Sequence, residues 1–144
     1  MKVRATGVYI EDGKLLLIKQ LVNADRGYSL PGGTLEENET LEHCLIRELQ
    51  EETGLEVRIK RLLYVCDHIT EDKHVLHITF EVEKTGGSLI GPVTGLDTVP
   101  IEKVEMVPFS EIEERGLSEK FASLIRSGFP DAGRYMGAKK NIGL

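Results

Sequence analysis

The stretch RELQEETGL, residues 47–55, places three glutamates and an arginine at the end of a predicted helix. Over residues 40–53 the apolar side chains share one helical arc, which should face a core: Leu41, Cys44, Leu45 and Leu49. The glutamates 48, 51 and 52 are spaced i, i+3, i+4, so they converge on one face, and that face overlaps the apolar arc. Carboxylates turned toward a core repel one another and lose hydration, which a solvated surface helix does not require.

A site for a hard divalent cation explains this pattern. Carboxylate oxygens on a rigid helix are the ligands that Mg²⁺ and Mn²⁺ prefer. The spacing of Glu48, Glu51 and Glu52 therefore predicts a metal site near the end of the helix.

Length and composition indicate one domain over residues 1–144. The 144 residues, 40% of them hydrophobic and 29% charged, are typical of a globular domain with its own core. A net charge of −6 argues against broad nucleic-acid binding but allows a small anionic ligand held through metal ions. The N-terminal segment enters a strand pattern without a long apolar run, so we expect no membrane span and a cytoplasmic location. Cys44 and Cys66 are interpreted as small core residues rather than a disulfide or redox pair.

The order of elements predicts a mixed α/β or α+β sandwich. A hairpin is predicted from strands 3–10 and 15–20, and a loop from 21–33. The helix 40–53 should end at Gly54, which suits a C-terminal cap. Further elements are predicted in this order: strands 55–66 and 74–83, a loop 84–100, a strand 101–107, a short helix 110–116 and a helix 118–128. The tail 128–144 has weak periodicity and is either a docked arm or a partly ordered end.

Residues 33–55 as a whole resemble the Nudix box, whose pattern is G-x5-E-x7-R-E-U-x-E-E-x-G-U with U a bulky aliphatic residue. Every fixed position is matched, by Gly33, Glu39, Arg47, Glu48, Leu49, Glu51, Glu52, Gly54 and Leu55. The resemblance extends over about residues 3–127 and implies an α+β fold of the Nudix type, an α/β/α sandwich with a mixed sheet between helices.

The resemblance also implies a hydrolase that cleaves a phosphoanhydride bond in a nucleoside diphosphate linked to another moiety, with Mg²⁺ or Mn²⁺ as cofactor. Glu51 and Glu52 would be the principal metal ligands. Glu48 would be a further ligand or would orient the attacking water, and the Gly32 carbonyl would add another ligand. Arg47 would keep the carboxylates aimed by pairing with glutamates such as Glu39 or Glu48.

Other candidate residues lie outside the box. Many members of the family have a further catalytic carboxylate beyond the box, for which the candidates here are Asp97, Glu102 and Glu105, with Glu102 favoured. The alternative for each of the three is an ordinary charged residue on the surface. Tyr28 could stack on a base or ribose, or simply pack. Arg4 and Lys19 could reach phosphate, or simply flank the sheet. The three histidines His68, His74 and His77 could contact phosphate or activate water, or be ordinary strand and loop residues.

The substrate subclass stays open. Thr70 and Asp72 stand where some subgroups carry a proline or a tyrosine, which weakly disfavours ADP-ribose and dinucleoside polyphosphate hydrolysis. A nucleoside triphosphate or related nucleotide is the expectation, with a non-catalytic nucleotide sensor on the same fold as the alternative. An RNA-processing hydrolase is disfavoured by the negative charge. Homodimerisation is common in the family and is left open.

Overall fold

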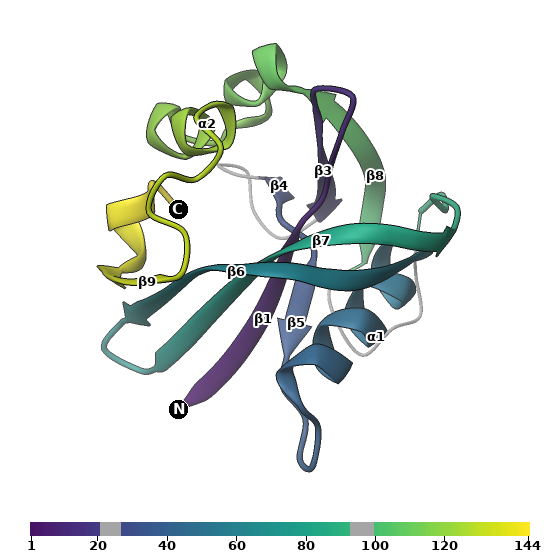
Figure 1. Ribbon diagram of the computed structural model, residues 1–144. Helices are drawn as coiled ribbons and strands as arrows, with labels where there is room; N and C mark the ends of the chain where they lie inside the picture. The colour runs from purple at the N-terminus through teal and green to yellow at the C-terminus, as the bar shows by residue number, and fades with distance from the viewer. Residues whose placement is uncertain (21–26, 93–99) are drawn as a thin grey trace.

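The computed structural model describes residues 1–20, 27–92 and 100–144, which form two β-sheets flanked by two α-helices (Figure 1). The first sheet has five strands in the order β5-β1-β7-β6-β9. It is mixed, because β1 runs parallel to β7 and β6 runs parallel to β9, whereas β1–β5 and β6–β7 are antiparallel. Its strands are β1 (Lys2–Val8), β5 (Gly32–Thr34), β6 (Leu55–Ile69), β7 (His74–Gly87) and β9 (Arg134–Ala138).

The second sheet is antiparallel and is built around β3. Its strands are β2 (Ile10–Glu11), β3 (Lys14–Gln20), β4 (Tyr28–Ser29) and β8 (Ile101–Pro108). The turn between β2 and β3 uses Asp12 and Gly13, both with positive φ, at 52° and 72°. Left-handed backbone at both central positions matches the twist of a tight hairpin, which is why an Asp-Gly pair stands here.

The predicted hairpin of 3–10 with 15–20 is only partly right. Ile10 and Glu11 pair with β3, and the Tyr9 carbonyl accepts a hydrogen bond from the Leu16 amide, whereas residues 2–8 leave for the first sheet as β1. β1 lies between β5 and β7, strands that come from far along the chain. Both halves of 3–10 have strand composition, so the switch of sheet between them leaves no local signal.

The core has two parts, one on each side of the sheets, as expected for helices on both faces. α1 (Leu41–Thr53) buries Leu45 and Leu49 against Ala5 of β1 and Leu16 of β3. α2 (Glu119–Arg126) packs with the other cluster, which includes Leu15, Leu17 and Leu63. Successive residues of β3 thus point into opposite clusters, as the period of a strand requires. Figure 1 shows the two helices on opposite sides of the strands, so the predicted Nudix-type α/β/α sandwich is confirmed.

Several boundaries differ from the sequence-based ones. β6 and β7 are longer than predicted, and β7 occupies the first residues of the predicted loop 84–100. Residues 110–116 do not form one short helix but parts of two 3₁₀ turns, η1 (Phe109–Glu111) and η2 (Glu113–Arg115). α2 starts after Ser118, whose hydroxyl accepts a hydrogen bond from the Phe121 amide and so caps the helix.

The tail forms structure that its weak periodicity did not predict. β9 pairs with β6, and the 3₁₀ turn η3 (Lys139–Ile142) follows it. Cys44 and Cys66 are free and fully buried, which confirms their interpretation as core residues. Among the described residues, no helix has the length and apolar character needed to span a bilayer.

Candidate active site

The box helix, which is α1 and carries Arg47 and the three glutamates, is fixed at both ends by local hydrogen bonds. Thr40 accepts a hydrogen bond from the His43 amide at its N-terminus. Gly54 ends the helix in the left-handed region, with φ of 83°, and its amide donates to the Gln50 carbonyl. Glycine takes this conformation without a Cβ penalty, which is why it closes the helix. The caps set the helical register that brings Glu48 and Glu52 toward β5.

The two glycines of β5 allow the glutamates to lie against its backbone. A Cβ on Gly33 would overlap the Glu48 carboxylate, and a Cβ on Gly32 would overlap the Ala5 carbonyl of β1. The Gly32 amide donates a hydrogen bond of 2.8 Å to Glu52 Oε1. The strand and the helix therefore meet through carboxylate-to-backbone contacts rather than through apolar side chains.

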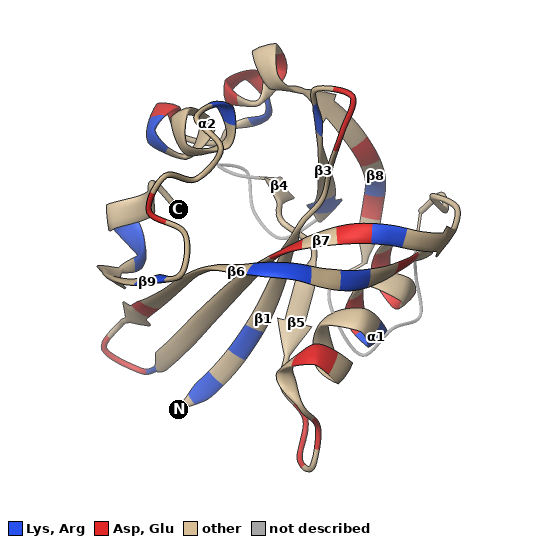
Figure 2. Cartoon of the chain, in the orientation of Figure 1, with Lys and Arg blue, Asp and Glu red and all other residues tan. Residues whose placement is uncertain are grey.

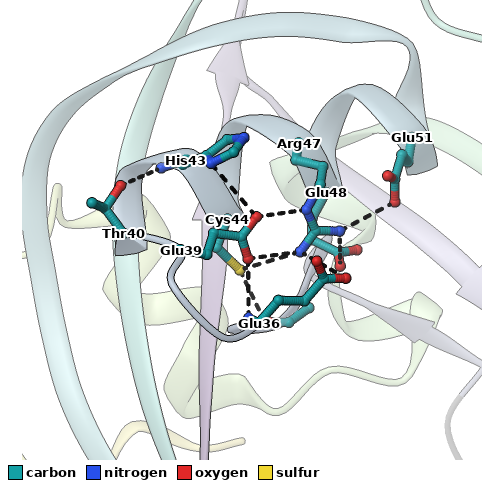
Figure 3. A network of polar contacts seen from close by, with 9 residues as sticks. Glu36, Glu39, Thr40, His43, Cys44, Arg47, Glu48 and Glu51 are labelled. Atoms are coloured by element: carbon teal, nitrogen blue, oxygen red, sulfur yellow. Dashed lines mark hydrogen bonds and ion pairs between the residues drawn. The ribbon is translucent and has the colours of Figure 1, made fainter.

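Arg47 lies at the centre of a carboxylate network (Figure 3). Its Nε donates to Glu39 Oε2 at 2.7 Å and its Nη2 donates to Glu39 Oε1 at 2.9 Å, a bidentate pair. Its Nη1 contacts Glu48 Oε1 at 2.9 Å and Glu51 Oε2 at 3.4 Å. These hydrogen bonds hold the pKa of Glu39 well below its usual range, at about 2. The geometry agrees with the pairing expected of Arg47, whose part in activity stays a prediction.

Glu52 is the most buried carboxylate of the cluster, with 5% of its surface exposed. Burial raises its pKa to about 8, and the nearby charges of Glu48 and Glu51 act in the same direction. The Gly32 hydrogen bond and the charge of Arg4 oppose that rise. Burial also raises the pKa of Glu48, against the effect of Arg47. The ionised forms of Glu48 and Glu52 are thus not fully compensated by water or by a cation of the protein.

The donor chemistry of this cluster fits a divalent cation. Over the described residues, no group of three His, Cys, Asp or Glu side chains is already arranged to hold a metal ion. Glu48 and Glu51 instead face Arg47, so their carboxylates would have to turn to share a cation with Glu52. A cation would relieve the unfavourable burial that raises the pKa of Glu52, and hard oxygen donors match Mg²⁺ or Mn²⁺. The residues present therefore fit such an ion.

Glu52 is expected to lower the stability of the metal-free protein progressively as pH rises from about 4.5 to about 8. The folded-state pKa of Glu52 lies above its unfolded value, so the folded state binds the extra proton in this window and releases it at higher pH. The measurement is the Tm in EDTA at several pH values, for the wild type and for Glu52→Gln. The variant should show a flatter pH dependence, and added Mg²⁺ should raise the wild-type Tm most above pH 8. Parallel curves for the two proteins would contradict the assignment.

A cavity of about 280 Å³ is lined by residues of β1 and β7 together with later segments, and none of the α1 glutamates is among its described lining residues. Arg4, Thr6, His77 and Thr79 all line it. Thr6 and Thr79 hydrogen-bond to each other across the strand pair at 2.8 Å. His77 and Thr79, two residues apart on β7, thus both face this cavity. Arg4 lines the cavity, and its charge opposes the rise in the pKa of both Glu48 and Glu52.

The candidates on and near β8 have other partners. Glu102 is close to half exposed and pairs with Lys19, with 3.6 Å between Nζ and Oε2. Glu105 accepts hydrogen bonds from Tyr28 at 3.0 Å and from Arg115 at 2.6 Å, which hold its pKa at about 2. Neither contact links these carboxylates to the box glutamates, so a metal-binding role for Glu102 gains no support. Asp97 lies outside the described residues.

Tyr28 does not line the cavity, although the two residues that follow it, Ser29 and Leu30, do. Its hydroxyl donates a hydrogen bond to Glu105. Its ring packs against the α2-side core, the cluster that includes Leu15, Leu17 and Leu63. A stacking role for Tyr28 therefore stays an unsupported prediction. Sequence analysis left His77 open and did not single out Thr6 or Thr79. Their signal was present only as polar residues alternating with apolar ones on paired strands.

Comparison with known proteins identifies the family. The family model described as NUDIX domain matches residues 1–127, so the chain belongs to the Nudix family. Solved structures with the same fold include a UDP-X diphosphatase, with a TM-score of 0.69 at 18% identity over 93% of this chain and 66% of that one. Another is a MutT protein from Bacillus halodurans, with a TM-score of 0.68 at 19% identity over 95% of this chain and 88% of that one.

Curated relatives are more similar in sequence over shorter stretches. An ADP-ribose pyrophosphatase of Methanocaldococcus jannaschii is 41% identical over 90 residues, which cover 60% of this chain and 53% of the relative. An 8-oxo-dGTP diphosphatase of Proteus vulgaris is 40% identical over 72 residues, which cover 44% of this chain and 64% of the relative. The chain thus matches between about half and two thirds of the length of these relatives.

Proposed function

We propose that this protein is a metal-dependent pyrophosphohydrolase that cleaves a phosphoanhydride bond of a nucleoside diphosphate linked to another moiety. The observation that carries the proposal is the position of Arg4. It lines the cavity and acts electrostatically on Glu48 and Glu52, so the candidate cation site lies within electrostatic reach of a cavity with basic side chains in its lining. A polyanionic substrate needs both at once, one to neutralise the bridge and one to hold the remainder. The names of the relatives agree with this class of reaction.

The residues of the chain have distinct parts in this mechanism. Glu52, Glu51 and Glu48 would hold Mg²⁺, or Mn²⁺ as the alternative ion, together with the Gly32 carbonyl. A bound divalent cation supplies charge neutralisation at the diphosphate and lowers the pKa of bound water. Glu48 is the candidate for orienting the attacking water. Arg4 would bind a phosphate oxygen at the cavity, where a guanidinium can donate two parallel hydrogen bonds.

Arg47 is a positioning residue in this proposal. Its contacts go to carboxylates of the box, chiefly to Glu39, so it fixes the loop before α1 and the rotamers of Glu48 and Glu51. With its N–H groups already donated to these glutamates, the Arg47 guanidinium has few donors left to bind the substrate. Arg47 and Glu39 would therefore aim the metal-binding carboxylates without taking part in the reaction themselves.

A hydrolysis screen tests the proposal. The full chain would be incubated with Mg²⁺ and, separately, with GTP, 8-oxo-dGTP, ADP-ribose, UDP-glucose and a dinucleoside polyphosphate, and the products separated by chromatography. We expect turnover of at least one of these, with products cut at the phosphoanhydride bridge. EDTA should abolish the turnover. Nucleotide binding without any hydrolysis in Mg²⁺ or Mn²⁺ would contradict the proposal.

A further inference from the structure

The last 17 residues, 128–144, form a docked arm that lies beyond the matched family domain. The arm is held to β6 by the β9 pairing and by a hydrogen bond of 2.8 Å from the Gly133 amide to the Leu63 carbonyl. Phe129 and Ile142 are each 2% exposed and belong to the α2-side core. Figure 1 shows the arm running from α2 to the edge of the first sheet at β6. The arm is therefore part of the folded body.

The end of the arm is fixed at the N-terminus of α2. The Ser118 hydroxyl donates a hydrogen bond of 2.6 Å to the Gly143 carbonyl. Gly143 itself has φ of 82°, and a Cβ there would overlap both the Ser118 hydroxyl and the Phe121 amide nitrogen. Glycine alone fits this close approach without strain. The preceding turn η3 is thereby held at a defined place beside the sheet.

That place is the wall of the substrate cavity. Lys139, Ile142 and Leu144 of the arm line the same cavity as Arg4 and His77. Residues that are distant along the chain thus share one cavity, and Figure 2 shows basic positions both on the N-terminal strand β1 and on the arm. Without the arm, the cavity would lose Lys139, Ile142 and Leu144 from its lining.

The charge of the lining is one-sided. Arg4, Lys73 and Lys139 line the cavity together with His68 and His77, and no Asp or Glu is among its described lining residues. The His77 pKa is lowered to about 4, chiefly by burial and then by the charges of Lys139 and Arg4. His77 is therefore neutral at pH 7, and the Asp, Glu, Lys and Arg side chains among the described lining residues are all basic: Arg4, Lys73 and Lys139. Such a lining favours groups rich in hydrogen-bond acceptors.

We propose that the arm completes the substrate cavity and that Lys139 is a specificity-determining residue, donating to an acceptor on the moiety attached to the diphosphate. This deepens the function proposed above and rests on it. The acceptor is either a carbonyl edge of a base or an oxygen of a further phosphate, since both accept from an ammonium group. Apolar contacts from Ile142 and Leu144 would pack against the rest of that moiety.

The test is Lys139→Gln in the full chain, with Lys140→Gln as the matched control. Lys140 is the next residue of the same turn, is exposed and does not line this cavity. We expect Lys139→Gln to raise KM about 10-fold or more on its preferred substrate, because a hydrogen bond from a charged donor contributes about 1.5–3 kcal/mol. We expect kcat to change less than about twofold, since uniform binding is lost rather than an interaction of the transition state. Lys139→Arg should restore most of the affinity.

The substrate panel identifies the acceptor. GTP and ATP differ at position 6 of the base, where guanine has a carbonyl and adenine an amino group. If Lys139→Gln raises KM for GTP but not for ATP, the acceptor is a base carbonyl. If KM rises equally for both triphosphates and stays unchanged for ADP-ribose, the acceptor is a further phosphate. An equal rise in KM for all three substrates would overturn the proposal, because Lys139 would then bind the diphosphate that they share. An unchanged KM with an unchanged Tm would also overturn it, because Lys139 would then bind no part of the substrate.

Binding measurements separate this inference from the proposed reaction. Calorimetry with Mg²⁺ and the same three nucleotides would compare Glu52→Gln with the double variant Glu52→Gln/Lys139→Gln. A Kd that rises selectively in the double variant would support the specificity role, even where the wild type turned over no substrate and the proposed reaction had failed. Equal Kd values in the two proteins would overturn it, whatever the turnover of the wild type.

Discussion

Replacing Glu52 with glutamine is expected to lower kcat by about 10²–10⁴-fold while the protein stays folded. The factor corresponds to the several kcal/mol that a bound cation contributes by neutralising charge in the transition state, at 1.36 kcal/mol for each tenfold in rate. Glutamine has nearly the same volume and can still accept the Gly32 hydrogen bond through its carbonyl oxygen. It lacks the negative charge that would hold the cation. Steady-state kinetics in Mg²⁺, on whichever substrate the screen selects, measure the effect.

The matched control is Glu42→Gln, a change of the same type on an exposed residue in the first turn of the same helix. Its kcat should stay within about twofold of the wild type, since exposed substitutions away from special features change little. Glu52→Gln should melt no lower than the wild type at pH 8 in EDTA, because the variant removes a buried charge. A Glu52→Gln protein with nearly full activity would show that the cation, if needed, is held elsewhere.

The box helix and its glutamates were predictable because their signals are local. Helical periodicity, the cap at Gly54 and the i, i+3, i+4 spacing all lie within one stretch of chain, and a helix has few ways to place them. The contact of Arg47 with Glu39 followed from the same stretch by resemblance. The burial of Glu52 also followed, since the carboxylate face overlaps the apolar arc.

What the sequence did not predict depends on which distant strands meet. The division of residues 3–10 between two sheets, and the docking of the tail on β6, are long-range pairings that leave no periodic mark. The cavity was missed for the same reason, because Arg4 and Lys139 approach only after both pairings have formed. Glu105 was one of three candidate carboxylates in the sequence, of which Glu102 was favoured, and only the fold brings Glu105 to Arg115 and Tyr28.

Arg47→Ala is expected to cost stability as well as activity. Arg47 is 21% exposed and its main partner Glu39 is 5% exposed, so the pair is largely withdrawn from water. Removing one member leaves the other as an uncompensated charge, which costs about 3–5 kcal/mol for a fully buried pair. With partial exposure we expect about 2–3 kcal/mol, or a fall in Tm of about 5–10 °C for a chain of this length. Thermal and denaturant unfolding measure it.

The control for this variant is Arg58→Ala, which breaks an exposed pair with Glu83 at 2.8 Å. The side chains of Arg58 and Glu83 are 68% and 44% exposed, so loss of this pair should lower the free energy of unfolding by less than about 1 kcal/mol. The difference between the two variants isolates the effect of burial on an arginine–glutamate pair. An Arg47→Ala protein that melts with the control would show that the network in Figure 3 does not hold the site together.

Two further measurements distinguish a positioning role for Arg47 from a general loss of stability. Arg47→Lys keeps the charge but cannot form the bidentate pair with Glu39, so it should recover part of the Tm and little of the activity. The stability gap between wild type and Arg47→Ala should also shrink as pH falls from about 4.5 to about 2, since Glu39 has its pKa lowered to about 2 in the folded wild type. Full activity in Arg47→Lys would mean that charge alone aims the glutamates. A kcat that falls in both variants, with KM little changed, would show that the shape of the guanidinium sets the geometry of the carboxylates it holds.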